Sequence, residues 1–114
     1  MSEAPLKWDA QLWERGLVRL DIRGDFNAES GEPLEKEFHH WFAQSAYSFV
    51  IGLAGVQRMT SGGGALLVTF IRIAQEHGGQ ATLVDPSDPV RRTLERLGVF
   101  SLCHTVGSLE EVFG

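Results

Sequence analysis

The second half of the chain carries the pattern that most constrains the fold: a strand, a helix and a second strand in close succession. Residues 49–53 are a short, continuous apolar run, as expected of a strand buried on both faces. Residues 61–77 have the apolar periodicity of a helix, and glycines at positions 78 and 79 end it. Residues 81–84 indicate another buried strand. This order predicts two parallel strands joined by a right-handed helical crossover.

The first half predicts an antiparallel hairpin followed by a helix. Residues 6–12 and 17–23 alternate between apolar and polar side chains, as in strands with one buried face, and residues 14–16 indicate the turn between them. We expect a loop at residues 24–27. A helix should follow from about residue 31 to 45, with Ser30 as its N-cap and Pro33 in its first turn. Its apolar stripe consists of Leu34, Phe38, Trp41 and Phe42.

The remaining segments complete one α/β domain. We expect a loop at residues 54–60, a helix at 87–97, a short strand at 102–106, and a closing helix that begins with a capping box at residue 108. The predicted fold is a mixed β-sheet of four to five strands, with an N-terminal antiparallel hairpin, packed with about four helices. The 114 residues suit one domain, which we assign to residues 6–114, after a flexible tail at residues 1–5.

Charge, cysteine content and hydropathy disfavour several classes of protein. The net charge is −5 and the basic residues are scattered, which disfavours a nucleic-acid ligand. Cys103 is the single cysteine, so no intrachain disulfide can form. No apolar run is long enough to span a bilayer, and the first residues lack the features of a signal peptide. We therefore expect a cytoplasmic protein that does not insert directly into a membrane.

Residues 60–64, TSGGG, are the strongest candidate for a functional site. Glycines at a helix start leave backbone N–H groups bare at the positive end of the helix dipole, which favours an anion. The alternative is structural: Thr60 or Ser61 caps the helix, and the glycines permit a tight turn. The lysine and the spacing of a P-loop are absent.

The histidines do not predict a metal site. His39 and His40 are adjacent, so they diverge around a helix and cannot chelate together. His77 and His104 have no partners at metal-ligand spacing. We therefore expect neither a metal nor another cofactor.

The other candidate side chains have simpler structural interpretations. Cys103 and His104 would point to opposite faces of a strand, which favours a buried structural thiol over a nucleophile. Asp25 and Asp85 flank loops and are expected to form turns. The three tryptophans are expected to pack in the core or at its edge.

An ordered set of motifs resembles the STAS family, the sulfate-transporter and anti-sigma-factor-antagonist domains. Residues 56–67, VQRMTSGGGALL, fit without gaps the family's pattern V-x-x-M-D-S-(S/T)-G-L-G and the apolar helix after it. Residues 24–27, GDFN, stand where the family often has G-E-L-D. Further segments are similar to the family's next strand, third helix and closing helix: residues 78–84, 90–99 and 108–112. The resemblance covers about residues 17–114 and implies a STAS-like fold.

Within this family, anti-sigma factor antagonists suggest a partner-switching function. In them, a serine or threonine at this helix start is phosphorylated by a partner serine kinase of GHKL type. The unmodified form captures that kinase, which is also the anti-sigma factor, and so frees the sigma factor. The resemblance implies a non-enzymatic regulatory module, with Ser61 or Thr60 as the possible phosphoacceptor.

The match also shows departures from the family pattern. Thr60 replaces the motif's aspartate, Gly62 takes the usual acceptor position, and Asn27 replaces the aspartate of G-E-L-D. The partner-binding surface implied by the match comprises Gly24, Asp25, Phe26, Asn27, Arg58, Met59, Thr60, Ser61, Gly62, Gly63 and Gly64.

Two alternatives stand beside partner switching. Residues 56–74 also resemble the STAS subunit of bacterial ABC systems that transport phospholipids, in which the pattern V-D-T-G-G-L-A-L-L occurs. That match implies an accessory subunit that binds the ABC transporter ATPase. The second alternative is a nucleotide-binding protein or small enzyme that uses the turn at residues 62–64, although a recognisable base, nucleophile or metal set is missing.

Overall fold

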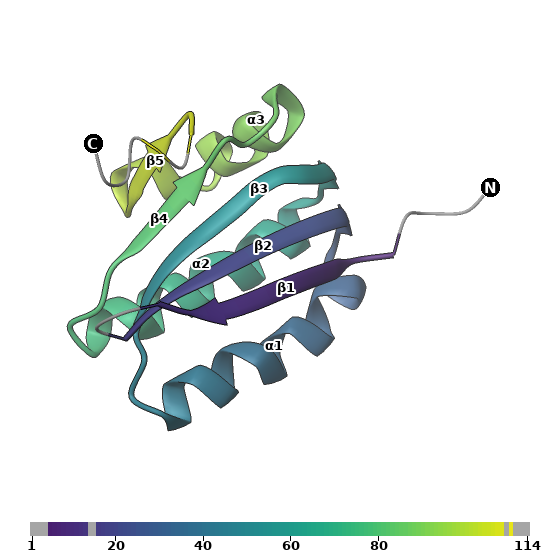
Figure 1. Cartoon of the computed structure of the whole chain (residues 1–114). Helices are drawn as coiled ribbons and strands as arrows, with labels where there is room; N and C mark the ends of the chain where they lie inside the picture. Colours follow the sequence, from purple (N-terminus) through teal and green to yellow (C-terminus); the bar gives the residue numbers. More distant parts are fainter. Residues whose placement is uncertain (1–4, 14–15, 109, 111–114) are drawn as a thin grey trace.

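Five strands form a single sheet in the order β1-β2-β3-β4-β5 (Figure 1). The computed structural model describes residues 5–13, 16–108 and 110. The strands are β1 (Lys7–Leu12), β2 (Leu17–Phe26), β3 (Ser48–Met59), β4 (Ala81–Val84) and β5 (His104–Val106). β1 pairs antiparallel with β2, and the other three pairs are parallel. The predicted hairpin and the predicted parallel crossover are both confirmed.

Helices cover one face of this sheet. In Figure 1, α1 (Ala28–Ala43) and α2 (Ser61–Glu76) lie on the same side, while α3 (Asp88–Arg96) lies beside the end of β3. A short 3₁₀ turn, η2 (Val99–Ser101), leads from α3 toward β5, which is shorter than the strand predicted at 102–106. The predicted closing helix falls largely on residues outside the described part of the chain, as does most of the predicted N-terminal tail.

The alternation in β2 explains how the sheet separates its two faces. Val18, Leu20 and Ile22 are buried beneath the helices, while the residues between them carry charge and face the other side. On that second face Arg23 Nη1 lies 2.8 Å from Asp9 Oδ2 of β1, which ties the hairpin together. Trp8 and Ala10 of β1 thus face the core together with the apolar positions of β2, as the alternation predicts, whereas Leu12 at the end of β1 is exposed.

The core is built around stacked aromatic rings between the sheet and the two long helices. The ring of Phe38 in α1 stacks on that of Phe70 in α2 at a centroid distance of 4.4 Å, and lies 5.0 Å from the ring of Phe49 in β3. Phe70 and Leu67 are fully or almost fully buried, which confirms the predicted inner face of α2. Burial of these large side chains is the main source of stability in a domain of this size.

A glutamate joins the edge strand β1 to α1. Glu37 accepts hydrogen bonds from two indoles: Trp8 Nε1 donates to Oε1 at 3.0 Å, and Trp41 Nε1 donates to Oε2 at 2.7 Å. Trp8 belongs to β1 and Trp41 to α1. The two tryptophans therefore pack at the edge of the core, as expected, and their polar atoms share one carboxylate.

The start of α1 differs from the prediction. The helix begins at Ala28, and its N-cap is Asn27 rather than Ser30. Ser30 N donates to Asn27 Oδ1 at 2.8 Å and Asn27 N donates to Ser30 Oγ at 2.9 Å, so the two residues form a reciprocal capping box. Pro33 consequently lies inside the helix rather than in its first turn. Because Asn27 and Ser30 both favour caps, the sequence did not distinguish them.

The loops predicted at residues 24–27 and 54–60 are wrong. β2 continues to Phe26 and β3 continues to Met59, because the two strands stay paired to their ends with irregularities near Arg23 and Gly24. Each strand then passes into its helix through one residue, Asn27 before α1 and Thr60 before α2. This tight connection positions the candidate site.

Candidate functional site

The two strand-to-helix connections lie next to each other. Phe26 and Met59 are paired at the ends of β2 and β3, and Thr60 N donates to Phe26 O at 3.0 Å. The structure thus brings together the two segments that the family match singled out. We call residues 24–27 and 58–64 the junction surface.

The glycines at the start of α2 permit close approach to neighbouring elements. A Cβ atom on Gly63 would overlap the carbonyl oxygen of Phe26, and one on Gly64 would overlap the side chain of Leu97. A Cβ on Gly62 would lie 3.0 Å from that of Ala28. These contacts hold α2 directly against the end of β2, the start of α1 and the segment after α3.

Thr60 caps α2 and uses two of the first N–H groups of the helix. Gly63 N donates to Thr60 Oγ1 at 3.1 Å, and Gly64 N donates to Thr60 O at 2.9 Å. The structural interpretation of Thr60 as a cap is therefore correct. Ser61 and Gly62, the first two residues of the helix, are exposed.

Ser61 presents a hydroxyl at this exposed end. It is the first residue of α2, it is exposed, and its hydroxyl forms no hydrogen bond within the described part of the chain. Thr60 is also exposed, but its Oγ1 is engaged as the cap acceptor. The two candidate phosphoacceptors thus differ in how freely their hydroxyls can react.

An ion pair lies within the junction surface. Asp25 is 5% exposed, and its Oδ2 lies 3.2 Å from Nη2 of Arg58, whose side chain is 66% exposed. The expected turn role of Asp25 is wrong because the residue belongs to β2. A hollow of about 80 Å³ lies between this pair and residues 26, 27 and 60. It is far smaller than the several hundred Å³ of a typical small-molecule site.

Thr93 is a contributor that the sequence analysis missed. This buried residue of α3 donates from Oγ1 to Met59 O at 3.0 Å, and Arg96 Nη2 donates to the same hydroxyl at 3.3 Å. The bond anchors α3 beside the junction surface. A threonine within a helical stripe gives no sequence signal of such a contact, because the distance in sequence between the partners is large.

The remaining candidate side chains lie outside the junction surface. Cys103 lies just before β5 and is half-buried rather than buried. It packs against the core, and burial raises the pKa of its thiol to about 11, which fits a structural thiol. Asp85 follows β4 with a φ of 52°, a conformation typical of turns. Within the described residues, histidine, cysteine, aspartate and glutamate form no group of three that could hold a metal.

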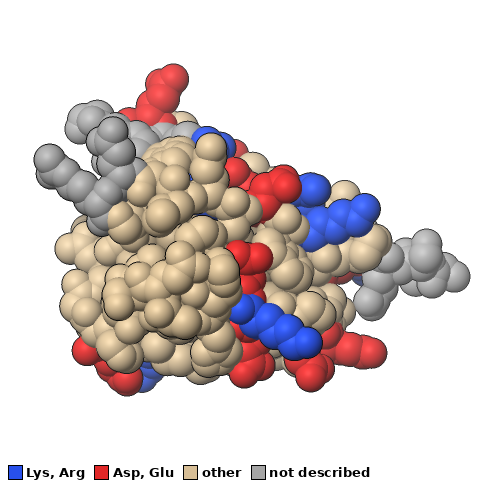
Figure 2. All heavy atoms as spheres, turned by 60° about the horizontal axis from the view of Figure 1, so that its bottom comes forward, with Lys and Arg blue, Asp and Glu red and all other residues tan. Residues whose placement is uncertain are grey.

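The rest of the surface carries charges of both signs (Figure 2) and a further hollow. Figure 2 shows acidic and basic side chains side by side on the right of the view, a broad uncharged area on the left, and no continuous basic area. A hollow of about 430 Å³ lies on the face of the sheet opposite the helices, between Arg19 and Arg23 on one side and Asp85 on the other. It does not reach the junction surface.

In the described part of the chain, no helix is both long and apolar enough to cross a membrane.

Residues 14–112 match the family model of the STAS domain. The chain belongs to the STAS domain family. The match covers nearly the whole chain and confirms the resemblance that the motifs at residues 24–27 and 56–67 indicated.

Solved structures with the same fold include anti-sigma factor antagonists. A Thermotoga maritima protein assigned to that class superposes with a TM-score of 0.82 at 16% identity, over 93% of this chain and 91% of that one. SpoIIAA in its unphosphorylated form gives 0.80 at 18% identity, over 94% and 93%. The Bacillus cell fate determinant SpoIIAA in its phosphorylated form gives 0.73 at 17% identity, over 94% and 96%. No curated protein matches the chain. The predicted fold class, a STAS-like mixed sheet, is confirmed.

Proposed function

We propose that this STAS domain is a non-enzymatic regulatory module that binds a partner protein through the junction surface, as a cytoplasmic regulator of the anti-sigma-factor-antagonist type. The observation that carries the proposal is the exposed Ser61 hydroxyl at the N-terminus of α2, directly after the one-residue connection at Thr60. The structural relatives described as anti-sigma factor antagonists support the same general kind of function.

The construction of the junction surface suits protein binding. Its backbone is fixed by the Thr60–Phe26 hydrogen bond, by the caps at Asn27 and Thr60, and by the close contacts of the glycines. A surface that is ordered before binding loses little conformational entropy when a partner docks. Since its hollow holds only about 80 Å³, a flat protein partner suits it better than an enclosed small molecule.

Ser61 is the better of the two candidate phosphoacceptors. Its hydroxyl is exposed, whereas Thr60 Oγ1 already accepts the capping hydrogen bond from Gly63. A phosphate on the first residue of α2 would add about −1.5 to −2 charges at the positive end of the helix dipole, so the helix tolerates it. The same charge would change the surface that a partner must cover, which is the physical basis of a switch.

The contacts of the glycine turn argue against a nucleotide site. Two of its N–H groups, those of Gly63 and Gly64, are engaged by Thr60, and both glycines are buried against other elements. A phosphate-binding loop instead presents successive free N–H groups and a lysine to its ligand. The glycines are thus better explained by close packing, which supports a binding role over an enzymatic one.

The test uses Ser61→Ala and Ser61→Asp with a GHKL-type serine kinase encoded by the same genome. Ser61→Ala should bind the kinase within about twofold of the wild type, because a small exposed change costs little. Ser61→Asp should bind at least about tenfold more weakly, since a carboxylate would lose its water at the interface. Thr69→Asp is the matched control, because Thr69 is an exposed hydroxyl residue on α2 two turns further on.

Calorimetry on the purified pair measures these affinities, and mass spectrometry after incubation with ATP locates any phosphate. Equal affinities for wild type, Ser61→Ala and Ser61→Asp would place Ser61 outside the interface. Phosphate on Thr60 alone would correct the assigned acceptor. Binding to an ABC ATPase from the same host, with none to the kinase, would favour the transport subunit instead.

A further inference from the structure

The arginines of α3 differ from those of the sheet. Arg19, Arg23 and Arg58 each lie within 3.2 Å of an aspartate oxygen. Arg91 and Arg92 in α3 are exposed, and no carboxylate of the described residues lies within ion-pair distance of either. Asp88 and Glu95 lie three or four positions from these arginines on the same helix, but neither forms an ion pair with them. Exposed guanidinium groups outside an ion pair can bind carboxylates of another molecule.

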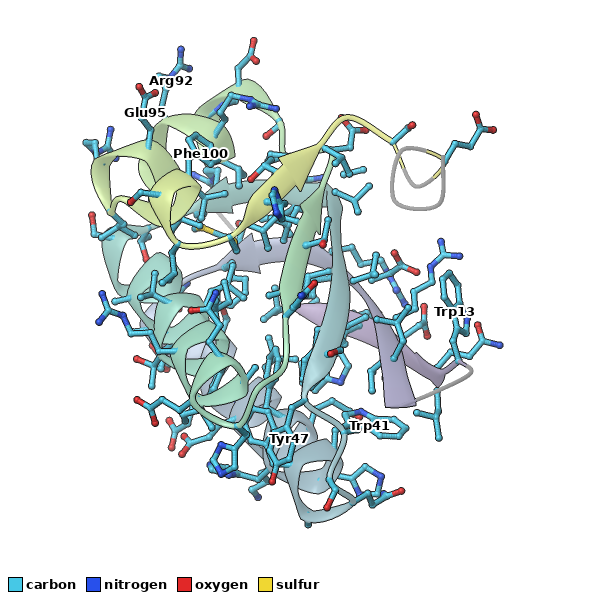
Figure 3. The ribbon with its side chains drawn as sticks, turned by 90° about the vertical axis from the view of Figure 1, so that its left-hand side faces the viewer. Trp13, Trp41, Tyr47, Arg92, Glu95 and Phe100 are labelled. Atoms are coloured by element: carbon cyan, nitrogen blue, oxygen red, sulfur yellow. The ribbon has the colours of Figure 1, made fainter. Side chains whose placement is uncertain are left out.

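An exposed aromatic ring lies beside Arg91. Phe100 of η2 is 37% exposed, and the guanidinium carbon of Arg91 lies 5.6 Å from its ring centroid. Figure 3 shows Arg92 and Glu95 projecting outward from α3, with Phe100 next to that helix. An exposed phenylalanine with a cation at its face offers an apolar contact and a charge in one place.

A hollow adjoins the ring. It encloses about 320 Å³ and is lined by residues 100–104, by Gln75 at the end of α2, and by Gln80 and Ala81 at the start of β4. Gln75 Nε2 donates to Leu102 O at 2.7 Å, which fixes one of its walls. Its lining is mixed, with Phe100, Leu102, Cys103 and Ala81 beside polar side chains. The volume is at the lower end of that of binding pockets, enough for one apolar side chain against Phe100 and Leu102 rather than for a large ligand.

We propose that Arg91, Arg92, Phe100 and this hollow form a second protein-docking surface, for an acidic partner segment that carries an apolar anchor side chain. We call it the α3 surface. The arginines pair with the carboxylates of the segment, and the anchor enters the hollow beside Phe100. The α3 surface contains neither Ser61 nor any other residue of the junction surface, so it is independent of the function proposed above.

The overall charge favours a protein segment over a polyanion. The chain carries a net charge of −5, which repels an extended anion such as nucleic acid or an acidic membrane. A short acidic segment responds mainly to the charges near it, because salt screens interactions beyond about 8–10 Å. The carboxylate of Glu95 on the same helix repels other carboxylates, so the α3 surface suits an acidic segment that is short.

The experiment uses the full chain and a fluorescent peptide of glutamates with one central leucine. Anisotropy should show binding that weakens at least about tenfold in the double variant Arg91→Glu with Arg92→Glu. Arg72→Glu, at an exposed arginine on α2 that also lacks a described carboxylate partner, should stay within about twofold of the wild type. Phe100→Ala should weaken the leucine peptide but not a peptide with alanine in its place.

Arg92→Ala provides a milder variant if the double charge reversal unfolds the chain, and the melting temperature of every variant is recorded. An equal loss in Arg72→Glu, or no binding at millimolar peptide, would overturn the proposal. So would tighter binding to duplex DNA or to vesicles of anionic lipid than to the leucine peptide. Ser61→Asp should bind the peptide as the wild type does, which keeps this test separate from that of the junction surface.

Discussion

Gly63 shows how little room the junction surface leaves for a side chain. Its Cα faces the carbonyl of Phe26, which belongs to the backbone and cannot rotate away. In an ordinary helix, replacing glycine by alanine stabilises by up to about 1 kcal/mol. At Gly63 the overlap of an added Cβ with the Phe26 carbonyl should instead make the substitution destabilising.

We expect Gly63→Ala to lower the free energy of unfolding by about 1–3 kcal/mol, as overpacking does. Urea titration followed by circular dichroism measures it. Gly62→Ala is the control, because its Cβ would meet only Ala28, whose Cβ is the nearest atom at 3.0 Å, and it should cost much less. If Gly63→Ala proves as stable as the wild type, α2 does not contact β2 as closely as described.

Cys103 gives the protein a stability that depends on pH. Burial raises its pKa from 9.0 to about 11 by disfavouring the thiolate. Between these values the unfolded chain releases the thiol proton while the folded chain retains it. The contribution of the Cys103 thiol to the free energy of unfolding is therefore fully present below pH 9, and it is lost as the pH rises through the folded pKa of about 11.

The measurement compares the wild type with Cys103→Ala. The free energy of unfolding of the wild type should fall more steeply than that of the variant between pH 9 and 11, and the two should run parallel below pH 9. Parallel curves over the whole range would mean that the thiol is more hydrated than its packing indicates.

At the scale of elements, the pairing of β2 with β3 extends both strands through residues whose local sequence favours loops. Gly24, Gly55 and the polar residues 57 and 58 have the composition of loops. In the structure Gly24 pairs with Val56 and Arg23 with Gly55, because two long parallel strands stabilise each other's ends. Such pairing joins residues about thirty positions apart, so no window of local sequence reveals it. Asp25 was misassigned for the same reason.

The docking of β1 on α1 depends on Glu37. Replacing it by alanine would leave the half-buried indole N–H groups of Trp8 and Trp41 without their acceptor, which should cost about 1–3 kcal/mol. Glu37→Gln retains one amide oxygen and should cost less. Amide hydrogen exchange should show faster exchange in β1 for Glu37→Ala than for the wild type.

Glu35→Ala is the matched control on the same helix. Glu35 is exposed, and its Oε1 lies 3.4 Å from Nε2 of the exposed His39, so its loss should change stability by less than about 0.5 kcal/mol. Equal effects of the two substitutions would show that the indole contacts contribute nothing beyond a surface charge.

At the scale of the whole molecule, the sequence predicted most of the architecture. The apolar periodicities predicted the hairpin, α2, β4 and α3, because each depends on burial repeated along one face. The family motifs predicted which two segments meet. The contacts that make the junction surface rigid could not be predicted, because Gly63, Thr93 and Asp25 act through partners distant in sequence.

One shared core also predicts one cooperative unfolding transition. Phe70→Ala should lower the free energy of unfolding by about 3–5 kcal/mol, since the ring is buried between Phe38 and the sheet. Leu12→Ala, at a residue 52% exposed, should cost far less. A denaturant midpoint unchanged by Phe70→Ala would show that this ring is not part of the core.

The shared carboxylate of Glu37 also gives the protein an optical reporter. Two of its three tryptophans donate their indole N–H groups to that carboxylate. Intrinsic tryptophan fluorescence therefore responds chiefly to the edge where β1 meets α1, whereas far-ultraviolet circular dichroism reports on the helices. The chain just before β1 rests on Gly24, where a Cβ would overlap the carbonyl of Pro5. Binding of a ligand beside Gly24 should therefore change the fluorescence of Trp8, which requires no attached label.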